Sequence, residues 1–63
     1  MARNFTAEEL RQCAEREVKL RRQVYPNRVE CGRMTQQLAD RQIAMMQAIA
    51  ERLRADEQTE RLL

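Results

Sequence analysis

Two long stretches of this sequence carry apolar residues at steps of three and four positions, and the only glycine and the only proline lie between them. In the first stretch, one side of a helix would hold Leu10, Cys13, Ala14, Val18, Leu20, Val24 and Tyr25. In the second, one stripe would hold Leu38, Ala39, Met46, Ile49, Ala50 and Leu53, with Ile43 and Met45 at its edges. Because this period fits α-helices, the sequence predicts an all-α fold of two amphipathic helices.

Capping residues mark the ends of the two predicted helices. Thr6 and Glu9 have the spacing of a capping box, and Thr35 is suited to cap the second helix. Pro26 disfavours helical geometry at the residue before it, and Gly32 can take the left-handed conformation that ends a helix. We therefore expect one domain, with helix one at about residues 6–25, a turn at about 26–34, helix two at about 35–56 and a frayed tail at 57–63. Within the turn, residues 27–31 are expected to form either a short helical turn or a loop.

A chain of 63 residues leaves much of its surface exposed, so its own core gives only marginal stability. Small proteins often add disulfides, a metal or a partner subunit, but this chain has two cysteines and no histidine. Cys13 is expected to pack as a small apolar residue, and Cys31 to be accessible near the turn. We predict an antiparallel two-helix hairpin that dimerises into a four-helix bundle. The expected core and interface residues are Leu10, Val18, Tyr25, Leu38, Met45, Met46, Ile49 and Leu53.

Three polar residues lie inside the apolar surfaces of the two predicted helices. Glu17 and Arg21 are four residues apart in the middle of the first arc, and Gln42 lies in the middle of the second stripe. Antiparallel pairing around Gly32 would bring Gln42 level with Glu17. We expect a buried or interfacial hydrogen-bonded cluster that fixes the register of the helices. The alternative is an ordinary surface ion pair between Glu17 and Arg21.

Positive charge is concentrated near the predicted turn, although the whole chain carries only +2. Between residues 16 and 33 there are six Lys or Arg residues against two Glu, a local excess of +4. A basic patch of Lys19, Arg22, Arg28 and Arg33 at the hairpin tip could contact phosphates or an acidic protein. Because aromatic residues are scarce, we favour a solvated surface and keep nucleic-acid binding as the alternative.

The chemistry of catalysis is missing from the residue inventory. Without histidine, neither cysteine has a base to activate it, and no carboxylate pair suggests acid–base work. We expect no enzyme activity, no metal and no cofactor. No stretch approaches the roughly 20 apolar residues that span a bilayer. The start at Met1 lacks the pattern of a secretory signal, so we expect a cytoplasmic protein without a membrane partner.

The middle of the chain also resembles a known group of proteins. The residues concerned are Leu20-Arg21-Arg22-Gln23-Val24-Tyr25-Pro26, then Val29, Gly32-Arg33-Met34-Thr35, Ala39-Asp40, Met46 and Ile49. This pattern, across about residues 10–54, resembles short uncharacterised proteins encoded by tailed phages and prophages of proteobacteria. The resemblance implies a helical hairpin distinct from the DNA-reading helix-turn-helix, in a bacterial host cytoplasm, and implies no activity.

From these observations together we predict a small interaction module of phage type that acts through self-association and binding of a protein partner. Two alternatives stay open. The first is an accessory protein that binds nucleic acid through the basic tip, and the second is an inhibitor of a host enzyme.

Overall fold

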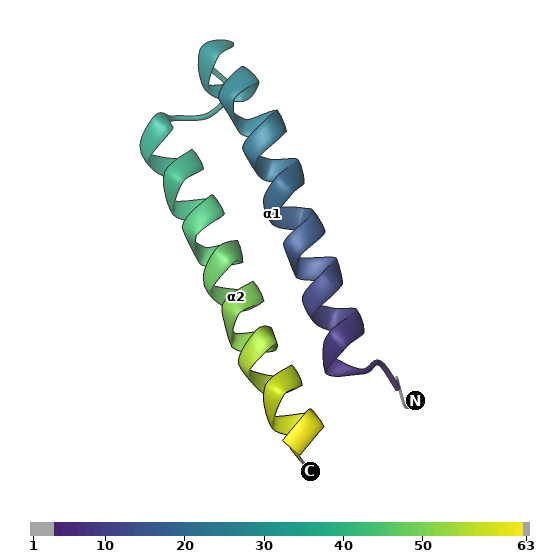
Figure 1. Ribbon diagram of the computed structural model, residues 1–63. Coiled ribbons are helices and arrows are strands. Elements are labelled where there is room, and N and C mark those ends of the chain that lie inside the picture. The colour runs from purple at the N-terminus through teal and green to yellow at the C-terminus, as the bar shows by residue number, and fades with distance from the viewer. Residues whose placement is uncertain (1–3, 63) are drawn as a thin grey trace.

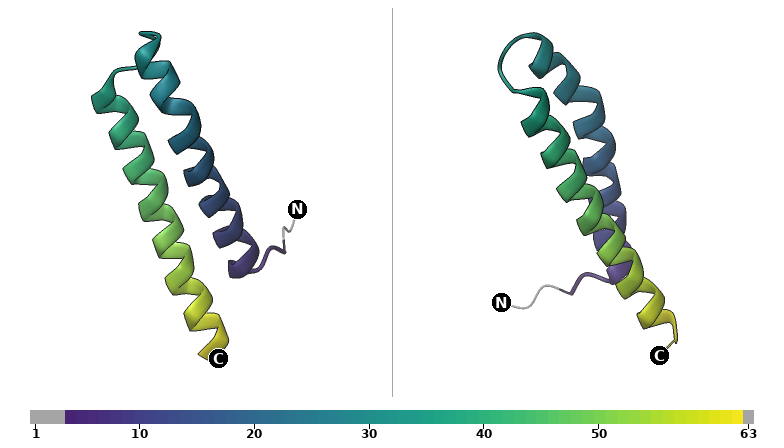
Figure 2. Two further views of the ribbon diagram at one scale, coloured as in Figure 1. Left: turned by 45° about the horizontal axis from the view of Figure 1, so that its top comes forward. Right: turned by 90° about the vertical axis from the view of Figure 1, so that its left-hand side faces the viewer.

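The computed structural model describes residues 4–62, which form two α-helices joined by a short turn (Figure 1). Helix α1 spans Ala7–Glu30, and helix α2 spans Gln36–Leu62. The helices lie side by side and antiparallel, so the start of α1 and the end of α2 lie at one end of the hairpin and the turn lies at the other (Figures 1 and 2). We call these the open end and the tip. The predicted all-α helical hairpin is therefore confirmed.

Side-chain caps start both helices. The Thr6 hydroxyl accepts a hydrogen bond from the Glu9 N–H at 3.1 Å, and the Glu9 carboxylate accepts one from the Thr6 N–H at 3.0 Å. At the start of α2, the Thr35 hydroxyl accepts a hydrogen bond from the Leu38 N–H at 3.1 Å. Both predicted caps thus satisfy backbone groups that a helix terminus leaves without partners.

Helix α1 continues to Glu30, so the predicted end of helix one near residue 25 is wrong. Pro26 removes only the hydrogen bond to the Arg22 carbonyl, and it is exposed, so water can satisfy that carbonyl. The helix ends where Gly32 adopts a φ of +78°. There the Arg33 N–H donates to the Arg28 carbonyl at 2.8 Å, which closes the last turn.

Helix α2 also runs further than expected, because the predicted tail from residue 57 is helical up to Leu62. Leu63 lies outside the described residues. Glu57 is buried against α1, where it pairs with Arg11. The contact between α1 and α2 therefore continues beyond Leu53. Leu62 is 86% exposed and contributes little to the contact between the helices.

The contact between the helices, which we call the seam, follows steps of four and three residues as in a coiled coil. Every seam residue is buried or half-buried. On α1 they are Ala7, Arg11, Ala14, Val18, Arg21 and Tyr25, and on α2 they are Ala39, Ile43, Met46, Ala50, Leu53 and Glu57. The four apolar residues that are buried in the described chain are all alanines, and no large side chain there is fully buried. The hairpin therefore has a narrow core of small side chains.

Candidate functional site

The two broad faces of the hairpin differ in chemistry. One helical residue turns the chain by about 100°, so the residue before a seam position points to one side and the residue after it points to the other. The side on which each residue lies can therefore be read from its place relative to the seam. Hydrogen bonds between the helices show which sides of α1 and α2 belong to the same face.

The first face is polar and is bridged by side chains. Arg22 donates to the Gln47 side-chain oxygen at 2.9 Å, and Arg54 donates to the Glu15 carboxylate at 2.6 Å. All four residues come directly after a seam residue, so the positions after the seam in both helices share this face. We call it the polar face. The Arg54 hydrogen bond lowers the pKa of Glu15 below its usual range.

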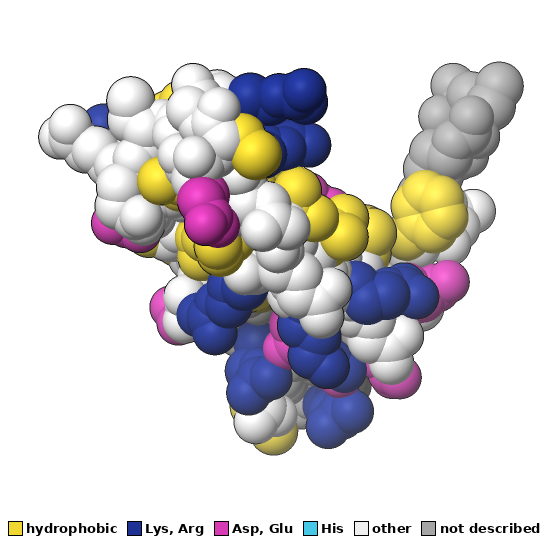
Figure 3. Space-filling view, turned by 90° about the horizontal axis from the view of Figure 1, so that it is seen from above, with side chains coloured by type: hydrophobic (Ala, Val, Ile, Leu, Met, Phe, Trp, Pro, Cys, Tyr) yellow, Lys and Arg dark blue, Asp and Glu magenta, His cyan; other side chains and the backbone are white. Residues whose placement is uncertain are grey.

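The opposite face carries large apolar side chains beside a few polar ones, Glu17, Gln42, Arg52 and Asp56, which also come directly before seam residues. It carries five large side chains that each come directly before a seam residue, namely Leu10, Leu20, Leu38, Met45 and Ile49. Each of them is between 41% and 51% exposed. We call this surface the apolar face. Viewed from above, hydrophobic side chains reach the surface beside Lys and Arg side chains (Figure 3).

The predicted core and interface residues divide between these two environments. Val18, Tyr25, Met46 and Leu53 are half-buried in the seam, whereas Leu10, Leu38, Met45 and Ile49 are exposed on the apolar face. Cys13, which we expected to pack, is exposed, as is Cys31. The reason for the difference is geometric. One neighbouring helix covers only a narrow strip of another, so the edges of a broad apolar arc stay uncovered.

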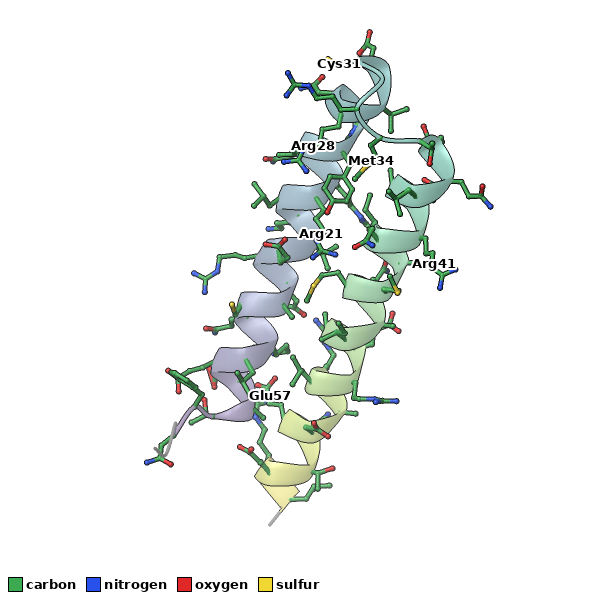
Figure 4. The ribbon with its side chains drawn as sticks, turned by 180° about the vertical axis from the view of Figure 1, so that it is seen from behind. Arg21, Arg28, Cys31, Met34, Arg41 and Glu57 are labelled. Atoms are coloured by element: carbon green, nitrogen blue, oxygen red, sulfur yellow. The ribbon has the colours of Figure 1, made fainter. Side chains whose placement is uncertain are left out.

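The predicted polar cluster comes together around Arg21. Its Nε donates to Glu17 at 2.9 Å, and its Nη1 donates to the backbone carbonyl of Gln42, also at 2.9 Å. The expected contact with Gln42 is thus made through its backbone and not its side chain. The Arg21 side chain is 22% exposed and that of Glu17 is 40% exposed, so the cluster lies at the margin of the seam. Arg21 links the two helices near the middle of the hairpin (Figure 4).

A second polar cluster, near the open end, was not predicted. Arg11 donates to both Glu57 and Glu15, and the other oxygen of Glu57 accepts from Arg61 at 3.0 Å. The hydrogen bond that Arg11 donates to the Glu57 carboxylate raises the pKa of Arg11 above its usual range. Glu57 lies between the two helices in Figure 4. The signal was available in the sequence, because Arg11 and Glu57 continue the alternating steps of four and three at matched ends of the helices.

The four residues of the predicted basic patch form two separate pairs. Arg28 lies at the tip, where its guanidinium is 5.6 Å from the centre of the Tyr25 ring, and Arg33 follows in the turn. Lys19 and Arg22 lie further down α1, and a rise of 1.5 Å per residue separates Lys19 from Arg28 by about 13 Å. Arg22 is also engaged with Gln47 on the polar face.

The described residues form two open grooves of about 310 Å³ each, one on the polar face and one on α2 beside Ile49, Arg52 and Asp56. The groove on the polar face is lined by Glu15, Val18, Arg22, Gln47, Ala50, Glu51 and Arg54, and several of these already bond to one another. Within residues 4–62 no three cysteine or acidic side chains come together as metal ligands. Neither helix, over the part described, has a stretch that is long and apolar enough to cross a membrane. No family model matches the chain, and neither a curated protein nor a solved structure is detectably similar to it.

Proposed function

We propose that this protein is a helical-hairpin interaction module that pairs with a second copy of itself through the apolar face. Two hairpins stacked in this way form a four-helix bundle, in which short loops connect antiparallel neighbours. A twofold arrangement lets the same surface serve both copies. The bundle then presents its polar faces and its tips to a protein partner. The phage or prophage origin and the cytoplasmic location stay predictions from the sequence.

The observation that carries this proposal is that the hairpin buries small apolar side chains and leaves large apolar side chains partly exposed. Among residues 4–62 the buried apolar residues are four alanines, whereas five large apolar side chains lie half-exposed on one face. A chain of this size has only marginal stability from its own core, so the burial of more apolar surface would stabilise it substantially. Completing the burial of one half-exposed Leu or Ile side chain contributes about 1 kcal/mol. A second copy would complete this burial on both hairpins.

The apolar face differs from the scattered hydrophobic residues that are normal on protein surfaces. Leu20, Met45 and Ile49 come from both helices, yet all of them point to the same side of the seam. The opposite side has charged and amide residues at the equivalent positions, with hydrogen bonds from Arg22 to Gln47 and from Arg54 to Glu15. A one-sided distribution of this kind is typical of a surface that another molecule covers.

Light scattering at micromolar protein concentration tests the proposal. The wild-type chain should have twice the 7.5 kDa mass of one copy. Ile49→Glu places a charge on the apolar face, so it should weaken association by at least about 100-fold, since a buried unpaired charge is costly. Ala44→Glu is the matched control, because Ala44 is exposed and comes directly after a seam residue, on the polar face.

The two variants separate a specific interface from a general effect of added charge. We expect Ala44→Glu to keep the wild-type mass and the wild-type helix content by circular dichroism. A monomeric wild-type chain, or an Ile49→Glu variant that associates as the wild type does, would show the proposal to be wrong.

A further inference from the structure

The two halves of the hairpin carry opposite net charge. We divide the described chain into a tip half, residues 19–47, and an open half, residues 4–18 and 48–62. The tip half has six cations, Lys19, Arg21, Arg22, Arg28, Arg33 and Arg41, and two anions, Glu30 and Asp40, for a net charge of +4. The open half has five cations, Arg11, Arg16, Arg52, Arg54 and Arg61, and eight anions, Glu8, Glu9, Glu15, Glu17, Glu51, Asp56, Glu57 and Glu60, for a net charge of −3.

The apolar face is centred where these two halves meet. The contacts of Arg11 with Glu57 and of Arg22 with Gln47 define which residues of the two helices lie level with each other. By interpolation between these pairs, Leu20 on α1 lies level with Ile49 on α2, and Met45 lies about one turn nearer the tip. The most apolar part of the face is therefore close to the middle of the hairpin. Two stacked copies would bury it whether their tips point the same way or opposite ways.

Charge distinguishes these two orientations. Stacking with the tips together places the +4 half against the +4 half and the −3 half against the −3 half. Stacking with the tips apart places each positive half against a negative half. Packed helices lie about 8–10 Å apart, which is close to the screening length of about 8 Å at physiological ionic strength. The charged residues that come directly before a seam residue, and so lie on the apolar face, are Glu17, Arg52 and Asp56, and all three belong to the negative half. Their net negative charge is close enough to a stacked copy to favour contact with its positive half over contact with its negative half.

We infer that the second copy binds in the opposite orientation, with its tip beside the open end of the first. This inference rests on the proposed self-association. The twofold axis then runs across the hairpin near its middle, α1 packs on the partner's α1, and α2 packs on the partner's α2. Leu20, Met45 and Ile49 of both copies form one central apolar layer. The positively charged tips lie at the two far ends of the bundle.

The exposed Cys31 at the tip allows a direct measurement of this orientation (Figure 4). In a Cys13→Ser variant, Cys31 is the single site for a spin label. Cys31 is eleven residues from Leu20, so each label lies about 16 Å from the axis along the helix direction. Pulsed electron resonance on the dimer should therefore give a distance between labels of about 30–40 Å.

The same measurement distinguishes failure of the orientation from failure of the dimer. With the tips together, the labels would lie within about 20 Å of each other, since packed helices are about 8–10 Å apart. That result, with a dimeric mass by light scattering, would overturn the orientation and leave self-association intact. A monomeric mass with no coupling between labels would overturn both. Raising the salt concentration from 0.05 to 0.5 M should weaken the dimer, because it screens the opposite charges.

Discussion

The seam and the apolar face of this hairpin use different residues for different tasks. The alanines of the seam let the helices approach closely. The contact of Arg21 with the Gln42 carbonyl and that of Arg11 with Glu57 fix the register of the two helices. The apolar face carries the large side chains, Met45 and Ile49 among them, but places them outside the contact between the two helices. The comparison shows that the contact between α1 and α2 fixes how the two helices are placed. The large apolar side chains outside that contact are available to a second molecule.

The largest effect on helix pairing should come from enlarging a seam alanine. Ala39 is 2% exposed, so Ala39→Leu forces extra methylenes between the helices and should destabilise the fold by up to about 3 kcal/mol. Urea unfolding followed by circular dichroism measures the change. Ala44→Leu adds the same atoms at an exposed position and should change the free energy of unfolding by less than about 0.5 kcal/mol. Equal unfolding midpoints for the two variants would mean that the seam is not closely packed.

A smaller loss is expected when the buried carboxylate of the seam is neutralised. Glu57→Gln keeps the shape of the side chain but weakens its hydrogen bonds with Arg11 and Arg61, which should cost about 1–2 kcal/mol. Glu60→Gln is the control, because Glu60 is exposed in the same part of α2. Hydrogen exchange of the amides in residues 53–62 should rise in Glu57→Gln alone. The role of Glu57 in extending α2 is refuted if both variants exchange as the wild type does.

On the polar face, removing a hydrogen bond between the helices should change the free energy of unfolding much less. Arg22→Gln loses the hydrogen bond to Gln47, but both side chains are exposed, so the expected change in unfolding free energy is within about 0.5 kcal/mol. The mass by light scattering should also stay that of the wild type. A change in association would show that the polar face, and not the apolar face alone, takes part in the dimer.

The smallest effect is expected for Glu15→Gln, and it should appear in how the free energy of unfolding depends on pH below neutrality. Arg54 lowers the pKa of Glu15 in the folded chain, so Glu15 contributes stability above the usual carboxyl pKa of about 4.3. This contribution is lost as the pH falls through the lowered pKa. The stability difference between wild type and Glu15→Gln should therefore be present at pH 7 and diminish as the pH falls through the lowered pKa. A difference that is independent of pH would exclude this linkage.

Sequence patterns predicted the two helices because capping residues and apolar periodicity are local signals. Thr6, Thr35 and Gly32 act within one helical turn of their own positions, so their roles did not depend on tertiary structure. The helix ends expected near residues 25 and 56 were placed wrongly for two different reasons. The exposed Pro26 costs α1 only one backbone hydrogen bond, so the helix continues until Gly32 ends it. In α2, the long-range contact of Glu57 with Arg11 outweighs the local preference.

The candidate site was harder to predict because apolar periodicity does not separate a seam from its margins. Counting apolar residues placed Val18 and Ile49 on similar surfaces, although the first is half-buried and the second is exposed. The pair of Arg11 and Glu57 was missed because Glu57 was placed in the predicted frayed tail, residues 57–63. The alternating steps of four and three that include both residues are visible in the sequence, but the register between the two helices is needed to pair them.

The most direct test of the account is the dependence of stability on protein concentration. If folding requires the second copy, a tenfold rise in chain concentration stabilises the folded dimer by about 1.4 kcal/mol relative to unfolded chains and raises the urea midpoint. Circular dichroism at 2 and 20 μM measures this shift. We predict a higher midpoint at 20 μM. Identical midpoints, with one cooperative transition at both concentrations, would show that a single hairpin folds alone and would contradict the central claim.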